Sequence, residues 1–134
     1  MLGNTLQLIS QFRRAYFSET AQSLKAEKPE LLDQIIGYIE HHYADRLTMS
    51  GVAKRFYVSE RTISALFRKR LGTTFNQFLT QRRLIAAKSL ILEGLPMETA
   101  AERAGFADYS TFYRAFRKEF GISPNGFRNQ NASN

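Results

Sequence analysis

Basic residues placed beside aromatic and hydroxyl-bearing residues occur twice in this sequence, 49 residues apart. The triplet Phe67-Arg68-Lys69, followed by Gly72, matches the triplet Phe116-Arg117-Lys118, followed by Gly121. Three further pairs share this offset: Thr74 with Ser123, Asn76 with Asn125, and Phe78 with Phe127. Lys and Arg side chains neutralise phosphate groups, and hydroxyl groups donate and accept hydrogen bonds. These residue types therefore favour the binding of a polyanion over covalent chemistry.

The charge distribution places this binding surface in the second part of the chain. Residues 51–130 hold 14 Lys and Arg against six acidic residues, a net charge of +8, whereas residues 1–50 hold five against six. Such asymmetry suits either a nucleic acid or an anionic membrane surface. A basic helical module that binds an anionic membrane or a protein partner is therefore the alternative to a nucleic-acid-binding protein.

The composition offers little for catalysis or metal binding. The chain has no Cys, which excludes a disulfide, a thiolate metal site and a Cys nucleophile. The two His, His41 and His42, are adjacent, and we expect them at a helix C-terminus, where a protonated imidazole is favourable. The sequence shows no nucleophile elbow, Gly-rich phosphate loop or carboxylate pair near a His. We therefore predict no enzymatic activity, no metal and no cofactor.

The 134 residues are 43% apolar, enough to bury the core of one small domain or two half-size ones. No apolar run approaches the ~20 residues of a membrane span, and the N-terminus lacks a signal-peptide pattern. We therefore expect a soluble, cytoplasmic protein that does not enter a membrane.

The apolar residues recur at helical spacing, and no segment alternates like a strand, so we predict an all-α fold. An amphipathic helix is expected over Asn4–Phe17, followed by a polar linker that reaches residue 28. The next helix is expected to begin at Pro29 and to bury Leu31, Leu32, Ile35, Ile36, Ile39 and Tyr43. Residues 1–28 are thus interpreted as a separate segment, either a remnant of a sensor domain, a dimerisation helix or a packing helix.

Capping residues delimit the helices that follow. Thr48 is the N-cap candidate for a short helix that ends near Phe56. Ser59 is the N-cap candidate for a helix over Arg61–Leu71, which ends at Gly72. Thr74 and Gln77 form a capping box for a long helix over Phe75–Leu92. Further helices are expected over Met97–Ala104 and Tyr109–Phe120, with Asp108 as the cap of the second and a last turn at Ser123-Pro124. The predicted domain covers residues 29–128. It comprises a first copy of the repeated unit over 29–74, a linker helix over 75–93 and a second copy over 95–128. Residues 129–134 are predicted to form a disordered tail.

Each copy is a short helix, a tight turn and a second helix, which is the arrangement of a helix-turn-helix. An α-helix fits the major groove of B-DNA, and the outward residues of each second helix are the candidate base and phosphate contacts. In the first copy these are Arg61, Thr62, Ser64, Ala65 and Arg68. In the second copy they are Tyr109, Ser110, Thr111, Tyr113, Arg114, Arg117 and Lys118. The linker helix, at 1.5 Å per residue, is ~27 Å long, close to the spacing of successive major grooves.

Four features of the sequence resemble a known family. They are the duplicated helix-turn-helix, the Gly105-Phe106 turn, the second Phe-Arg-Lys triplet and the ending Ser123-Pro124-x-x-Phe127-Arg128. From about Leu31 to Arg128 the chain resembles the DNA-binding domain of AraC/XylS-family transcription regulators. The resemblance implies a homeodomain-like fold of two helix-turn-helix subdomains, joined by a long central helix, with two recognition helices in successive major grooves of promoter DNA. It also implies transcription activation by contact with RNA polymerase.

The resemblance places base-reading positions at Arg61, Ser64 and Ala65, and at Tyr109, Ser110, Tyr113 and Arg114. Three residues depart from the family pattern: Ala65 replaces a long polar side chain, Tyr57 a small turn residue, and Ala100 a bulky aliphatic residue. Ala65 offers only its methyl group to a thymine, so readout by the first copy is expected to depend on Arg61. On the linker helix, Arg82, Arg83 and Lys88 are interpreted equally well as a solvated face or as phosphate contacts.

Overall fold

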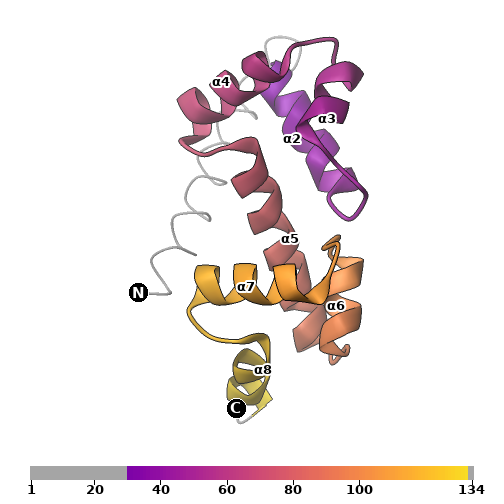
Figure 1. Ribbon diagram of the computed structural model, residues 1–134, viewed down its shortest axis with the longest axis vertical. Helices are drawn as coiled ribbons and strands as arrows, with labels where there is room; N and C mark the ends of the chain where they lie inside the picture. Colours follow the sequence, from indigo (N-terminus) through magenta and orange to yellow (C-terminus); the bar gives the residue numbers. More distant parts are fainter. Residues whose placement is uncertain (1–29, 133–134) are drawn as a thin grey trace, which may run out of the picture.

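The computed structural model describes residues 30–132, and within that range the chain forms seven α-helices and no strand (Figure 1). The helices are α2 (Leu31–His42), α3 (Met49–Arg55), α4 (Glu60–Leu71), α5 (Phe75–Leu92), α6 (Met97–Arg103), α7 (Tyr109–Phe120) and α8 (Pro124–Ala132). The prediction of an all-α fold is confirmed. Pro29 and the helix and linker predicted before it lie outside the described residues.

The central helix α5 connects two subdomains that each have their own hydrophobic core (Figure 1). The first subdomain comprises α2, α3, α4 and the beginning of α5, with Phe75 and Leu79 in its core. The second subdomain comprises the rest of α5 with α6, α7 and α8, and its core takes Leu84, Ala87 and Ile91 from α5. One continuous helix therefore contributes to both cores, which explains why it needs 18 residues.

The core of the first subdomain is built mainly from branched aliphatic residues around the buried rings of Phe67 and Phe75. Its buried residues on α2, α3 and α4 are Leu32, Ile35, Ile36, Ile39, Val52, Ala53, Ile63, Phe67 and Leu71. The core of the second subdomain is richer in aromatic rings. Its buried residues after α5 are Met97, Ala100, Ala101, Ala104, Phe106, Phe112, Phe116, Phe120 and Phe127. No helix among residues 30–132 has both the length and the apolar character needed to cross a membrane.

Side-chain caps begin α3, α4 and α5 where the sequence places them, whereas α2 begins at Leu31, after the N-cap Glu30, rather than at Pro29. The hydroxyl oxygens of Thr48 and Ser59 accept hydrogen bonds from the backbone N–H of Gly51 at 3.0 Å and of Thr62 at 3.1 Å. The box of Thr74 and Gln77 at the start of α5 is formed, since each side chain accepts from the backbone N–H of the other. These bonds satisfy donors that have no partner inside a helix.

The predicted C-terminal tail is corrected by the structure, because α8 continues to Ala132 and includes four of the residues expected to be disordered. Pro124 begins this helix, and Ser123 Oγ accepts a hydrogen bond from the backbone N–H of Gly126 at 3.0 Å. Phe127 is buried in the second core, and Asn131 Nδ2 donates to the backbone oxygen of Phe127 at 2.8 Å. The sequence signals only the first turn of α8, and the burial of Phe127 accounts for its extension through the polar residues that follow.

Candidate nucleic-acid interface

The helices α4 and α7 each bury one stripe of residues and leave the opposite face outside the core. In α4 the buried residues Ile63, Phe67 and Leu71 recur every four positions. In α7 the same spacing is occupied by Phe112, Phe116 and Phe120. Since positions four apart lie on one face of a helix, this stripe fixes which side chains point outward.

The candidate residues of the first copy lie mostly on the outer face of α4. The side chains of Arg61, Ala65 and Arg68 belong to exposed residues. Thr62 is exposed as well, but its Oγ1 is 2.9 Å from Ser59 Oγ, so its hydroxyl already has a hydrogen-bond partner. Ser64 is half-buried, and its Oγ is 3.5 Å from Met49 Sδ on α3.

Of the candidate residues of the second copy, all on α7, five are exposed and two are half-buried. The exposed ones are Ser110, Thr111, Arg114, Arg117 and Lys118. Tyr109 and Tyr113 are half-buried, with ring centroids 6.3 Å apart, so each presents only part of its ring to solvent. Burial, together with the charge of Glu98, raises the pKa of Tyr109 above its usual value. The phenol therefore stays protonated and keeps its donor.

Asp108 acts at the start of α7 as the sequence predicts. Its Oδ1 accepts a hydrogen bond from the backbone N–H of Thr111 at 2.7 Å. Hydrogen bonds from the backbone and side chain of Thr111 lower the pKa of Asp108 below its ordinary value. Its carboxylate is therefore used as a helix cap.

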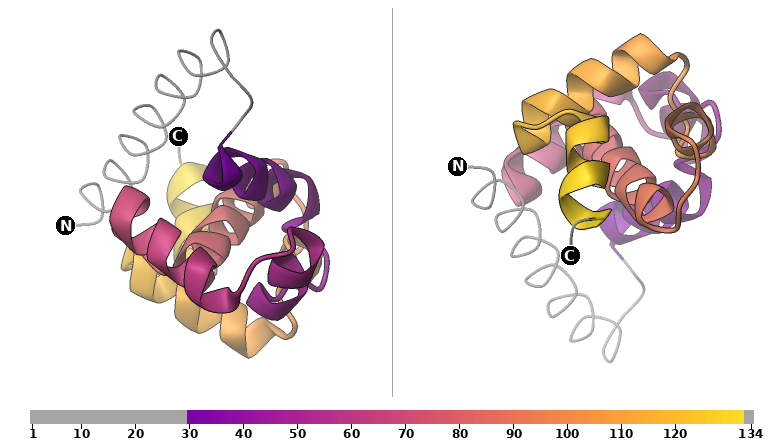
Figure 2. Two further views of the ribbon diagram at one scale, coloured as in Figure 1. Left: turned by 90° about the horizontal axis from the view of Figure 1, so that it is seen from above. Right: turned by 90° about the horizontal axis from the view of Figure 1, so that it is seen from below.

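The two outer faces lie on the same side of the molecule. Figure 1 shows α4 above α7 along the long axis, with α5 running from one to the other, and Figure 2 shows α4 and α7 running in about the same direction. Their last turns both carry basic residues, Arg68, Lys69 and Arg70 on α4 and Arg117 and Lys118 on α7. The arrangement gives one face with two exposed, cationic helices.

Two cations of α5 that the sequence leaves undecided have internal partners. Arg82 Nε donates to Glu40 Oε2 at 2.8 Å, and the two side chains are only 19% and 25% exposed. Its guanidinium carbon also lies 4.4 Å from the ring centroid of Tyr43. Lys88 Nζ lies 4.9 Å and 5.2 Å from the ring centroids of Phe120 and Phe127. Both cations therefore have partners within the fold, which favours a packing role around α5 over a purely solvated face.

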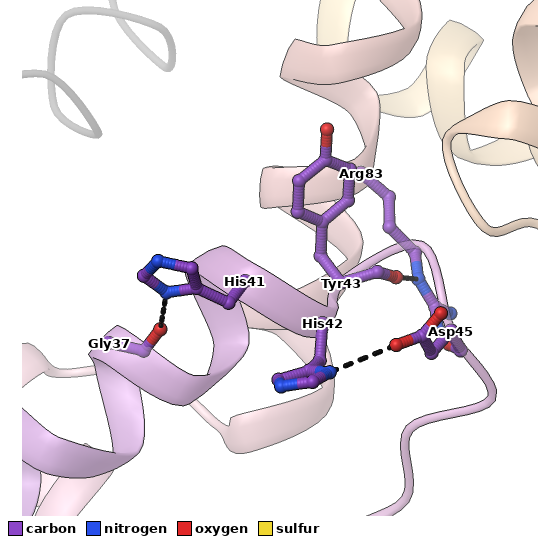
Figure 3. Close-up of polar contacts among 6 residues, drawn as sticks. All are labelled: Gly37, His41, His42, Tyr43, Asp45 and Arg83. Carbon is purple, nitrogen blue, oxygen red and sulfur yellow. Dashed lines mark hydrogen bonds and ion pairs between the residues drawn. The ribbon is translucent and has the colours of Figure 1, made fainter.

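Arg83 has a comparable internal role, which the sequence does not reveal. Its Nε and Nη2 donate to the backbone oxygens of Tyr43 at 2.7 Å and Asp45 at 2.9 Å (Figure 3). Burial lowers the pKa of Arg83 below its ordinary value. The acceptors lie 40 and 38 residues earlier in the chain, so only the fold brings them together.

The two histidines lie at the end of α2, as predicted (Figure 3). His41 Nδ1 donates to the backbone oxygen of Gly37 at 2.8 Å, and His42 Nδ1 donates to Asp45 Oδ2 at 3.0 Å. Among residues 30–132, no cluster of three or more His, Asp or Glu is placed to hold a metal ion. Their contacts are those of residues that finish a helix.

Comparison with known proteins gives the family. A family model described as a helix-turn-helix domain matches residues 52–130. The chain is 40% identical over 102 residues to an uncharacterized helix-turn-helix transcriptional regulator, YijO, of Escherichia coli, covering 75% of this chain and 36% of that protein. It is 32% identical over 124 residues to the transcriptional activator RhaS of Salmonella schwarzengrund, covering 92% of this chain and 43% of RhaS.

The fold is also that of a domain solved together with DNA. The DNA-binding domain of the global transcriptional factor AdpA, in complex with a target DNA, superimposes with a TM-score of 0.71 and 25% identity. The match covers 75% of this chain and 91% of that domain. The chain spans less than half the length of the two curated relatives. Its two helix-turn-helix units, its sequence and its structural likeness agree, and the chain belongs to the AraC-type helix-turn-helix family of DNA-binding transcription regulators.

Proposed function

We propose that this chain binds duplex DNA by placing α4 and α7 in two successive major grooves, and that it activates transcription from the bound promoter. The observation that carries the proposal is the parallel placement of two exposed cationic helices on one side of the molecule (Figure 2). An α-helix fits the major groove, and successive grooves on one face of B-DNA are 34 to 36 Å apart, about 10 base pairs. A central helix of 18 residues, ~27 Å long, is the right size to separate two such probes.

The residues on the two helices divide by the contact that each can make. Near the N-terminus of α4, Arg61 has a side chain long enough to read a guanine with two hydrogen bonds, and Arg114 does the same on α7. Ser110 and the half-buried Tyr109 and Tyr113 offer shorter donors beside Arg114. The cations of the last turns, Arg68, Arg117 and Lys118, are assigned to phosphates, which fix register and add salt-dependent affinity.

Ser64, Thr62 and Thr111 have a smaller part in this proposal. The hydroxyl groups of Thr62 and Ser64 have partners within the first subdomain, and the backbone N–H of Thr111 is bound to Asp108. Ala65 is exposed and supplies a methyl group for a thymine.

The decisive experiment selects bound duplexes from a random pool with the full chain and then maps the contacts by footprinting. We expect a site of about 20 base pairs with two protected stretches on one face, one helical turn apart. Binding should persist against competitor DNA, and its logarithm should fall linearly with the logarithm of salt concentration. A single protected groove, or binding that requires anionic lipid vesicles instead of DNA, would contradict the proposal.

Activation is supported by the name of RhaS, a transcriptional activator, and it implies a cytoplasmic protein that contacts RNA polymerase at the promoter. Transcription from a promoter that carries the selected site should rise when the protein is added to purified polymerase. A fall in transcription would make the protein a repressor. Self-association is proposed through the predicted helix within residues 1–28 or through an N-terminal domain outside this sequence. Sedimentation of the chain with and without DNA would detect the first route.

A further inference from the structure

The two subdomains meet at a contact outside α5. Gly105, in the turn between α6 and α7, lies against the loop between α2 and α3. A Cβ atom built at Gly105 would lie 2.6 Å from the backbone oxygen of Tyr43 and 2.9 Å from Ala44 Cα. Separations this short cannot be accommodated by backbone atoms, so the second turn rests directly on the first subdomain.

Arg83 lies at the same contact. Its Nε is 2.9 Å from the position of that Cβ atom, and the guanidinium holds the backbone oxygens of Tyr43 and Asp45 (Figure 3). The Tyr43 side chain packs against both hydrophobic cores. Three elements therefore converge: the middle of α5, the loop after α2 and the turn before α7.

The position of this contact along α5 gives it mechanical importance. Core residues of the first subdomain end at Leu79, and those of the second begin at Leu84. Bending or twisting of α5 between these residues would change the direction of α7 relative to α4. The Arg83 hydrogen bonds and the Gly105 contact join the two subdomains across this segment.

We propose that the junction formed by Arg83, Tyr43 and Gly105 sets the orientation of α7 relative to α4, and so determines which spacing between two DNA sub-sites the protein accepts. This inference rests on the proposed function. Arg83 acts in this proposal as a positioning residue, since its guanidinium holds the backbone oxygens of the loop after α2. A rigid junction holds both helices in the orientation that one spacing requires. The conformational entropy of fixing that orientation is then lost on folding rather than on DNA binding.

The test measures affinity for duplexes in which the selected sub-sites are separated by the optimal spacing, by one base pair more and by one base pair fewer. Each added pair rotates the second sub-site by about 34°, since B-DNA has about 10.5 pairs per turn. We expect the natural protein to lose about tenfold in affinity or more at either altered spacing. The two helices then no longer fit both sub-sites at once, so part of the affinity gained by binding both sub-sites together is lost. For Arg83→Met we expect weaker binding at the optimum and a nearly flat spacing profile.

The matched control is Arg82→Met, which removes the same charge one position earlier on α5. Arg82 pairs with Glu40 on α2 and lies over the Tyr43 ring, without a hydrogen bond to the loop oxygens. We expect this variant to keep the spacing profile, with any loss of affinity equal for all duplexes, because the Arg83 and Gly105 contacts remain. Parallel profiles for Arg83→Met and Arg82→Met would overturn the proposal.

A glycine pair gives a second test that leaves every charge in place. Gly105 and Gly94 have similar positive φ angles, 103° and 96°, but nothing lies within 4 Å of a Cβ atom at Gly94. Substituting each with Ala therefore imposes similar backbone strain, and only Gly105→Ala drives a methyl group into the junction. We expect Gly105→Ala to shift or flatten the spacing profile and Gly94→Ala to preserve it. Equal profiles for both variants would contradict the inference.

Residual dipolar couplings of the backbone amides in α4 and α7 test the junction without DNA. They should report one fixed relative orientation in the natural protein, and a changed or averaged orientation in Arg83→Met with each helix intact. A natural protein that binds no duplex would refute the proposed function alone. An unchanged orientation in Arg83→Met would refute the junction alone.

Discussion

Tyr57 and Gly105 occupy equivalent positions in the two helix-turn-helix turns, and both have a positive φ, 57° and 103°. The second copy meets this requirement with Gly, which adopts such angles readily. The first copy meets it with a Tyr whose side chain is 94% exposed. Duplication thus preserves the backbone of the turn while the residue that adopts it differs.

Replacing Tyr57 by Gly should stabilise the protein. The left-handed conformation costs an L-residue about 1–2 kcal/mol, whereas the extra freedom of Gly in the unfolded chain costs about 0.5–1 kcal/mol. We expect the free energy of unfolding to rise by about 0.5–1 kcal/mol in urea titrations. Tyr57→Ala is the control, since it removes the ring and keeps the strain, and it should give no such gain. A loss of stability in Tyr57→Gly would mean that the exposed ring makes a stabilising contact.

Local signals account for the parts of the fold that the sequence predicts. The bounds of α5 and α7 follow from the Thr74 and Gln77 box, from Asp108, and from Gly121. N-caps and left-handed C-terminal residues act within about four residues of the helix end, so they can be recognised from the sequence without the tertiary structure. The outward positions of Arg61 and Arg114 follow in the same way from the spacing of the buried residues.

Tertiary contacts account for what the sequence does not predict. Arg82, Arg83 and Lys88 read as an ordinary charged helix face, because their partners lie on segments distant in the chain. The extension of α8 depends on the burial of Phe127 rather than on the propensity of the polar residues after it. Whether a Tyr on α7 is exposed or half-buried also depends on its neighbours across the subdomain.

Arg61→Ala and Arg114→Ala should each weaken specific DNA binding by about 1–3 kcal/mol and relax sequence preference at a different sub-site. In the proposed function, Arg61 on α4 and Arg114 on α7 each read a base edge with two hydrogen bonds. Repeating the duplex selection with each variant measures the preference at both sub-sites. Arg117→Ala is the comparison, since a phosphate contact should weaken binding to all sequences and reduce the salt slope by about one. Uniform weakening by Arg61→Ala would make it a phosphate contact too.

Asp108→Ser should remove an acid-dependent part of the stability while keeping the cap on α7. The pKa of Asp108 is lowered in the folded protein, so its contribution is complete above the ordinary pKa of an aspartate, about 3.9, and is lost as the pH falls through the lower folded value. Ser caps α4 in the first copy without a charge, which makes it the natural replacement. Urea unfolding from pH 6 to pH 2 should show a shallower loss in Asp108→Ser than in the natural protein. Identical pH profiles would show that the carboxylate charge contributes nothing to the cap.

Glu119→Gln should stabilise the protein at neutral pH. Glu119 Oε1 is buried, has no hydrogen-bond partner among the described residues, and belongs to a carboxyl whose pKa is raised by burial and lowered in part by Lys118. A raised folded pKa means that folding favours the neutral acid, so stability falls as the pH rises above the ordinary glutamate pKa, about 4.3. Gln carries no charge at any pH, so its advantage should be present at pH 7 and should vanish below about pH 4. Glu102→Gln, on the exposed side of α6, is the control for charge alone, and an equal gain from both variants would attribute the effect to net charge instead of burial.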